Sequence, residues 1–130
     1  MFFKEILINK IANKFSNTIK NLEILSLKNT SSDALRIFNL TSILELDLSE
    51  NSLQKDIYNE IPFKSIKKLY LSDIKLNESL QFLNSKFNSE ITDLDMSKNL
   101  IDYDTFYCLN TSFNLSYLNL ALTNLTDLIF

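Results

Sequence analysis

The sequence of 130 residues contains no glycine, histidine or tryptophan, and it has a single cysteine, a single proline and a single arginine. Without histidine, Cys₂His₂ zinc sites and the Ser-His-Asp and Cys-His forms of catalysis are excluded. With one cysteine, a Cys₄ zinc site and an intrachain disulfide are excluded as well. The residues of this sequence therefore favour binding over catalysis, and we expect no enzyme activity, metal or cofactor.

Acidic residues outnumber basic residues, 16 to 13, so the formal net charge is -3. A sequence-independent grip on nucleic acid needs clustered Lys and Arg, so this balance argues against direct nucleic-acid binding. One local basic patch is present around Lys64, Lys67 and Lys68. Short charge runs of this kind are usually a solvated edge, and we favour that interpretation.

Long apolar runs are missing, and no stretch approaches the roughly 20 residues that span a bilayer. The N-terminal apolar run is interrupted by Lys4, Glu5 and Lys10, and no small-residue cleavage site follows it. It is therefore not a signal peptide, and the sequence predicts a cytoplasmic protein without a transmembrane segment.

What is present is a phrase that returns five times: a leucine-like residue, two variable positions, leucine, a variable position and leucine. The phrases begin 21 to 25 residues apart, at positions 22, 43, 66, 91 and 115. Such a period is typical of repeat architectures. The five instances are Leu22-x-x-Leu25-x-Leu27, Ile43-x-x-Leu46-x-Leu48, Ile66-x-x-Leu69-x-Leu71, Ile91-x-x-Leu94-x-Met96 and Leu115-x-x-Leu118-x-Leu120.

Counting from the first residue of each phrase, the apolar positions 4 and 6 alternate with positions 3, 5 and 7, which are polar apart from Ile24 and Ala121. Alternation predicts a short strand with one face buried. At position 9 the second and fourth phrases carry Asn51 and Asn99, whose buried amides can satisfy the turn that leaves the strand. Thr30 and Thr123 can supply part of that bonding and Ile74 cannot, so we expect a less regular loop near Ile74.

Apolar residues at helical spacing lie between the predicted strands. Apolar residues suggest short helices between the first two phrases, in the second interval up to Pro62, and in the third and fourth intervals (Ala34, Leu35, Phe38 and Leu40; Ile57 and Ile61; Leu80, Leu83 and Phe87; Phe106, Leu109 and Phe113). Core packing explains these stripes without a ligand. Proline cannot donate to a helix ladder, so the second helix should stop before Pro62.

The N-terminal residues 1–20 differ from the rest, since apolar residues recur every four positions from Phe3 to Ile19. This spacing predicts an amphipathic capping helix over about residues 2–15. The alternative is an extra, degenerate phrase at Phe3-x-x-Ile6-x-Ile8. With either reading, residues 1–130 form one domain, and we favour a cap at 1–20 followed by about five repeats over 21–130.

These phrases resemble the leucine-rich repeat superfamily of intracellular type, most clearly over 44–53 and 91–101. The segments 76–80 and 101–106 look somewhat like the ribonuclease-inhibitor-like class, although the subclass stays open. The resemblance implies an α/β solenoid, a right-handed curved horseshoe with a parallel concave sheet of about five strands and short convex helices. Members of the superfamily usually bind other proteins.

A concave sheet would expose positions 3, 5 and 7. We expect a protein partner with a basic or mixed-charge segment, although the same residues would also suit a merely soluble sheet face. Tyrosines are the best anchors because they combine contact area with a polar tip. The predicted partner-binding residues are Glu45, Asp47, Lys68, Tyr70, Ser72, Asp93, Asp95, Tyr117 and Asn119.

The apolar C-terminus suggests an alternative function. A repeat array with an uncovered end is insoluble, so the end residues could fold back or dock the chain as a small structural subunit of a larger assembly, including a ribonucleoprotein. A third possibility is that the chain is a fragment of a longer repeat protein. A fourth is membrane-surface binding through the lysines of the N-terminal helix. The possible end interface comprises Leu125, Leu128, Ile129 and Phe130.

Overall fold

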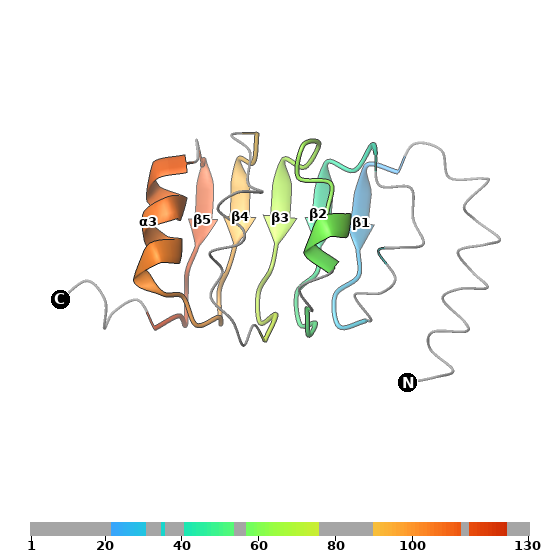
Figure 1. The fold of residues 1–130 in the computed structure, drawn as a ribbon. Helices are drawn as coiled ribbons and strands as arrows, with labels where there is room; N and C mark the ends of the chain where they lie inside the picture. Colours follow the sequence, from blue (N-terminus) through green and yellow to red (C-terminus); the bar gives the residue numbers. More distant parts are fainter. Residues whose placement is uncertain are drawn as a thin grey trace.

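The computed structural model describes residues 22–30, 35, 41–53, 57–75, 90–112 and 115–124. Five strands in these ranges form one sheet, in which neighbours along the chain are neighbours in space (Figure 1). All four pairings are parallel, as the repeated phrase predicts. The strands are β1 (Ile24–Ser26), β2 (Glu45–Asp47), β3 (Lys68–Tyr70), β4 (Asp93–Asp95) and β5 (Tyr117–Asn119).

The register of the sheet aligns equivalent positions of the five phrases. Position 4 provides the central residue of every strand, so Leu25 pairs with Leu46, and the alignment continues through Leu69 and Leu94 to Leu118. Because strand side chains alternate between faces, each phrase position forms a row across the sheet. The rows at positions 4 and 6 turn to the core.

Helical segments form a second layer below the core. The 3₁₀ helix η2 (Ile57–Glu60) ends before Pro62, as predicted, and α3 (Tyr103–Ser112) follows β4. Asp102 caps α3, since its Oδ1 accepts the Thr105 N–H at 2.8 Å, the usual role of an aspartate at this position. The expected helices over 2–15 and around 80–87 lie outside the described residues, as do all residues of 34–40 except the buried Leu35.

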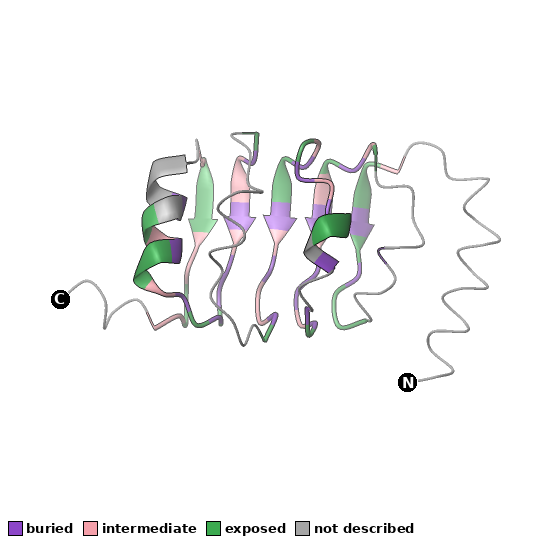
Figure 2. Ribbon diagram, in the orientation of Figure 1, coloured by how far each residue is buried: buried purple, intermediate pink, exposed green. Residues whose placement is uncertain are grey.

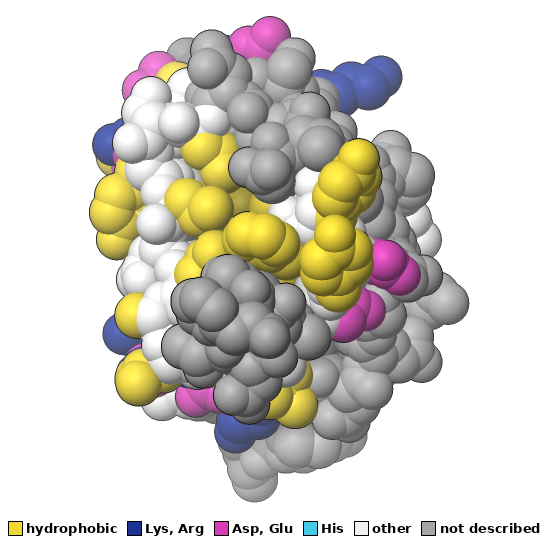
Figure 3. All heavy atoms as spheres, turned by 90° about the vertical axis from the view of Figure 1, so that its left-hand side faces the viewer, with side chains coloured by type: hydrophobic (Ala, Val, Ile, Leu, Met, Phe, Trp, Pro, Cys, Tyr) yellow, Lys and Arg dark blue, Asp and Glu magenta, His cyan; other side chains and the backbone are white. Residues whose placement is uncertain are grey.

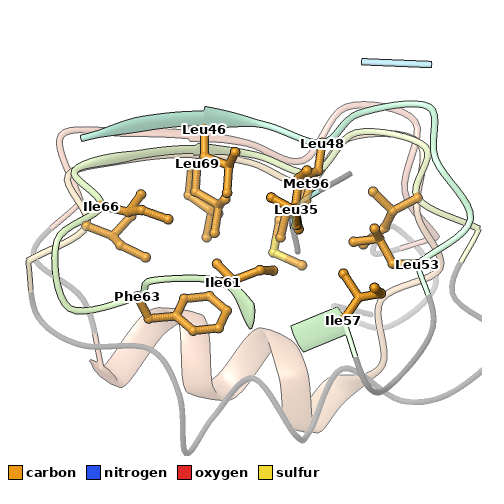
Figure 4. Close-up of a cluster of buried hydrophobic side chains, with 14 of the residues drawn as sticks. Leu35, Leu46, Leu48, Leu53, Ile57, Ile61, Phe63, Ile66, Leu69 and Met96 are labelled. Atoms are coloured by element: carbon orange, nitrogen blue, oxygen red, sulfur yellow. The ribbon is translucent and has the colours of Figure 1, made fainter. Parts of the chain in front are cut away.

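The core lies between these layers. In Figure 4, Leu46 and Leu69 descend from the sheet, and Ile57, Ile61 and Phe63 face them from the layer below. Positions 1, 4 and 6 are 0% exposed throughout the second, third and fourth phrases. The first and last strands are less enclosed, as the burial colours of Figure 2 also show. The central three strands therefore contribute the best-packed part of the core.

Buried amides at position 9 join adjacent loops. Asn99 Nδ2 donates to three carbonyls, and Asn99 Oδ1 accepts the Ile74 N–H at 3.1 Å. Asn51 Nδ2 makes three equivalent bonds, to carbonyls of the first and second phrases. Thr123 donates to Leu120 O at 2.8 Å and Thr30 donates to Leu27 O, which confirms the partial role predicted for threonine. The three carbonyls bonded by Asn99 Nδ2 are those of Leu71, Met96 and Ser97, at 2.7, 3.0 and 3.1 Å. The three bonded by Asn51 Nδ2 are those of Leu27, Leu48 and Ser49, at 2.9, 2.8 and 3.1 Å.

Every described turn after a strand has a left-handed residue at position 8, although the chain has no glycine. Left-handed backbone costs a non-glycine residue roughly 1–2 kcal/mol. The loop near Ile74 adds a further left-handed residue, Lys75 with φ 50°, which the other described phrases do not repeat. This departure agrees with the predicted irregularity. The position-8 residues are Asn29, Glu50, Asp73, Lys98 and Leu122, with φ of 51°, 58°, 51°, 57° and 57°.

Candidate functional site

The side of the sheet opposite the helices, called the open face below, presents positions 3 and 5 of each phrase. The register places the predicted residues side by side in two rows. The position-3 row reads Ile24, Glu45, Lys68, Asp93 and Tyr117, and the position-5 row reads Ser26, Asp47, Tyr70, Asp95 and Asn119.

Acidic residues on β2 and β4 flank the basic and aromatic residues of β3. Lys68 Nζ lies 3.8 Å from Glu45 Oε2, in an exposed ion pair. On its other side Lys68 is in register with Asp93, whose Oδ2 accepts the Thr92 hydroxyl at 2.7 Å. One lysine on β3 therefore stands between four carboxylates on its neighbours, and the centre of the face is acidic.

Tyr70 occupies the middle of the position-5 row and is half-buried. Burial, followed by the negative charges of Glu45, Asp93 and Asp47 and the proximity of Tyr117, raises the pKa of Tyr70 above its ordinary value of 10.0. Its hydroxyl therefore remains protonated near neutral pH and can donate a hydrogen bond at the surface.

The other position-5 residues have a structural task that the sequence analysis missed. Asp47 Oδ1 accepts the Ser49 N–H at 2.9 Å, and Asp95 Oδ1 accepts the Ser97 N–H at 2.9 Å. Asn119 Oδ1 accepts the N–H of Ala121 in the same way at 3.0 Å. An Asp or Asn that bonds the backbone two residues later is a common turn device. The recurrence of Asp or Asn at position 5, two residues before the turn, was the signal in the sequence that could have revealed this task.

The remaining oxygens of the two aspartates bond across the sheet. Ser26 Oγ donates to Asp47 Oδ2 at 3.3 Å, and Asn119 Nδ2 donates to Asp95 Oδ2 at 3.0 Å. Asp47 and Asp95 are thus partly committed to holding the strands. Glu45 and Asp93 of the position-3 row bond no turn backbone among the described residues: Glu45 pairs with Lys68, and Asp93 accepts from the adjacent Thr92.

The expectation that position 7 is exposed is wrong for Ser49 and Ser97, which are each only 6% exposed. Ser97 Oγ donates to Ser72 Oγ at 2.9 Å, and Ser49 Oγ accepts the Ser72 N–H at 3.3 Å. Tyr70 has no oxygen that could take that N–H as an aspartate does, so the neighbouring serine takes it. Ser72, a predicted partner residue, is therefore half-buried in a polar row that seals the strand ends.

Lysines of the predicted basic patch have acidic neighbours. Lys67 makes an ion pair and hydrogen bond with Glu90, which lower the pKa of the Glu90 carboxyl. Lys68 pairs with Glu45 as described. The local positive charge is therefore partly neutralised, which agrees with a solvated edge.

The described ranges contain neither a group of three acidic, histidine or cysteine side chains suited to a metal ion nor a helix able to cross a membrane. The predicted end interface, Leu125, Leu128, Ile129 and Phe130, lies outside the described residues.

Comparison of the chain with protein-family models, with curated proteins and with solved structures finds no match in any of the three.

Proposed function

We propose that the chain is a leucine-rich repeat protein that binds a protein partner through the open face of its sheet. Two observations support this assignment. The phrase recurs five times at a period of 21 to 25 residues, and the strands of the five phrases lie in register in one parallel sheet. On this proposal the sheet lines the concave side of a curved solenoid, with η2 and α3 on the convex side.

The observation that carries the binding role is the position of Tyr70 at the centre of the open face, between acidic residues on both neighbouring strands. Tyrosine supplies a large contact area at low entropic cost and is enriched among residues that dominate interfaces. Five strands about 4.8 Å apart give a face about 19 Å across. A face of this width supplies much of the roughly 800 Å² that each partner of a stable complex buries.

The charge of the face supports a particular kind of partner. Lys68 neutralises one of the four surrounding carboxylates, and Asp47 and Asp95 also serve the backbone. Asp93 is the carboxylate best placed for an outside group, because it lies next to Tyr70 and Lys68 without bonding a strand end. A basic or mixed-charge segment fits this arrangement. Charges at the rim add mainly to association rate and salt dependence.

Affinity capture from cells of the source organism, followed by quantitative mass spectrometry, tests this proposal. The test variant is Tyr70→Ala with Asp93→Asn, and the matched control is Tyr103→Ala with Asp104→Asn on α3, which faces away from the open face. Loss of one hot-spot tyrosine costs about 1–2 kcal/mol, which corresponds to roughly tenfold weaker binding. We expect specific partners to be lost with the test variant and retained with the control.

Circular dichroism should show that both double variants are folded. Equal recovery of the same partners by the test variant and the unsubstituted chain would remove the open face as the binding surface. Partners lost only with the control variant would move the interface to α3.

A further inference from the structure

The outer edge of β5 has the backbone groups of a strand that is ready to pair. In the inner strands, the N–H groups at positions 6 and 8 donate to the next strand. Met96 and Lys98 do so to Asn119 O and Ala121 O, both at 2.9 Å. The equivalent groups on β5 are the N–H groups of Leu120 and Leu122, and no hydrogen bond reaches them in the part of the chain that the structure describes.

Carbonyl groups at position 2 also form hydrogen bonds with the next strand. Thr92 O accepts the N–H groups of Ser116 and Tyr117 at 2.8 and 3.1 Å. Its equivalent one strand later, Ser116 O, accepts no hydrogen bond among the described residues. Unpaired donors and acceptors in a row are a template for another strand.

Side chains at this edge are also uncovered. Leu118 is 39% exposed, whereas its equivalent at the opposite edge of the sheet, Leu25, is 9% exposed. Figure 3 views the molecule from the β5 end, where hydrophobic side chains gather near the middle of the face. The two edges of the sheet therefore differ: the core is closed at β1 and open at β5.

The β5 strand is short, as edge strands often are, but neither charge nor proline guards it within residues 115–124. Natural sheets guard an exposed edge with charged residues, proline or bulges. Residues 115–124 contain no Asp, Glu, Lys, Arg or Pro, whereas residues 22–31, 43–52, 66–75 and 91–100 each carry charge. The edge consequently has the composition of a surface that is covered in the functional protein.

We propose that β5 is the contact between two copies of this chain, paired antiparallel about a twofold axis. Lack of charge favours a copy of the same chain, because two molecules of net charge -3 meet at this edge without like charges in contact. Twofold dimers are the commonest soluble oligomers, and their interface must be self-complementary. This contact is separate from the open face, so it does not depend on the function proposed above.

The geometry of a three-residue strand meets that requirement. With the axis at Leu118, Leu118 lies opposite Leu118 of the second copy, and Tyr117 lies opposite Asn119. Backbone groups alternate along a strand, so the N–H and C=O of Leu118 point outward together with the N–H of Leu120. Two such residues form a hydrogen-bonded antiparallel pair, in which each gives and receives one bond.

A head-to-tail contact between β5 and β1 of a second copy fits less well. Leu25 and Leu27 are 9% and 8% exposed, so the β1 edge offers no open core to match Leu118. The twofold pairing instead brings two open cores together. It also places both open faces on the same side of one continuous sheet.

Sedimentation velocity of the full chain, over a range of micromolar concentrations, tests the proposal. We expect a species of twice 15.1 kDa. Leu122→Lys should weaken this dimer at least tenfold, and the backbone should accept it because Lys98 already has φ 57° at the same position. Leu118→Lys should have the same effect. The matched control is Ile24→Lys on β1, at a side chain that is 63% exposed, and it should leave the dimer unchanged.

Disulfide trapping tests the antiparallel register. In a Cys108→Ser background, which removes the only native thiol, Leu118→Cys should form a covalent dimer on mild oxidation. The Cα atoms of a hydrogen-bonded antiparallel pair lie about 5.5 Å apart, within the usual disulfide range of about 4.4–6.8 Å. Ile24→Cys in the same background should stay monomeric.

Two results would overturn the proposal. One is a folded chain that sediments as a monomer over the whole concentration range. This result overturns the proposal even if an apolar peptide strand binds to the monomer. The other is a dimer that tolerates both lysine substitutions and gives no trapped Leu118→Cys product.

Discussion

The two buried asparagines provide the sharpest test of how the loops are held together. Asn99 makes four hydrogen bonds, three through its Nδ2 and one through its Oδ1, to which Ile74 N donates. Asn51 makes the same three through Nδ2, but its Oδ1 is buried and has no partner among the described residues. We predict that Asn99→Ala destabilises the chain more than Asn51→Ala, although both replace the same side chain at equivalent positions.

The size of the difference follows from the bond count. The three contacts of each Nδ2 share its two hydrogens, so at about 1 kcal/mol for each donated hydrogen and for the bond to Oδ1, Asn99→Ala costs about 3 kcal/mol and Asn51→Ala about 2 kcal/mol. A buried N–H that loses its partner adds about 1–3 kcal/mol, and Ile74, which is 0% exposed, loses such a partner only in Asn99→Ala. The two variants should therefore differ by about 2–4 kcal/mol in their free energy of unfolding.

Equilibrium unfolding in urea measures this difference, with linear extrapolation to zero denaturant. Ser52→Ala, at an exposed position of the same loop as Asn51, is the control, and it should change stability by less than about 0.5 kcal/mol. Equal costs for the two asparagines, or a larger cost for Asn51→Ala, would refute the reasoning from Asn99 Oδ1.

Three further predictions concern the turns, the core and the face. Lys98→Gly should stabilise the chain by up to about 1 kcal/mol, because glycine adopts positive φ without strain; a loss of stability in the urea midpoint would count against this. Leu94→Ala should cost about 2–5 kcal/mol of stability. The equivalent Leu118→Ala should cost clearly less, since Leu94 is 0% exposed and Leu118 is 39% exposed. The same urea experiment measures both losses, and equal losses would contradict the open core at β5. Removing the charge by Glu45→Gln should lower the pKa of Tyr70 toward 10.0, as followed by NMR of the Tyr70 ring, and an unchanged titration would exclude that carboxylate as a cause.

The raised pKa of Tyr70 also affects stability at high pH. Because the folded chain holds this proton more tightly than the unfolded chain, the contribution is fully present below pH 10.0 and is lost as the pH rises from there through the folded pKa. Tyr70→Phe should remove this part of the alkaline destabilisation. Urea midpoints on either side of pH 10.0 measure it, and an identical alkaline loss in Tyr70→Phe would show that other groups are responsible.

Hydrophobic spacing was sufficient to predict the strands. Leu46, Leu69 and Leu94 are the central residues of the phrases, and each is also the buried centre of a strand. Pro62 correctly marked the end of a helical segment, because the physical reason for the stop lies in proline itself. These features depend on one residue or on one period, so a single sequence contains them.

Features that depend on neighbouring strands could not be predicted in this way. Ser97 has the sequence position of an exposed residue, but it is buried because Ser72 on the adjacent strand provides a partner. The left-handed residues of the turns could not be predicted either, since Glu50, Lys98 and Leu122 have no common chemistry and glycine is absent. The acidic residues on both sides of Tyr70, in contrast, follow from the repeated phrase alone, because equivalent phrase positions lie side by side in the sheet.

The order of the strands has a consequence for how the sheet opens. Each strand pairs only with strands adjacent in the sequence, and no described strand connects β1 or β2 directly to β4 or β5. Detachment of β1 or β5 leaves four paired strands, whereas loss of β3 leaves two separate pairs. Two-stranded units are at best marginally stable, so the opening of β3 approaches global unfolding. In the monomeric chain, amide hydrogen exchange should therefore be slowest in the middle strand and fastest at the two edges.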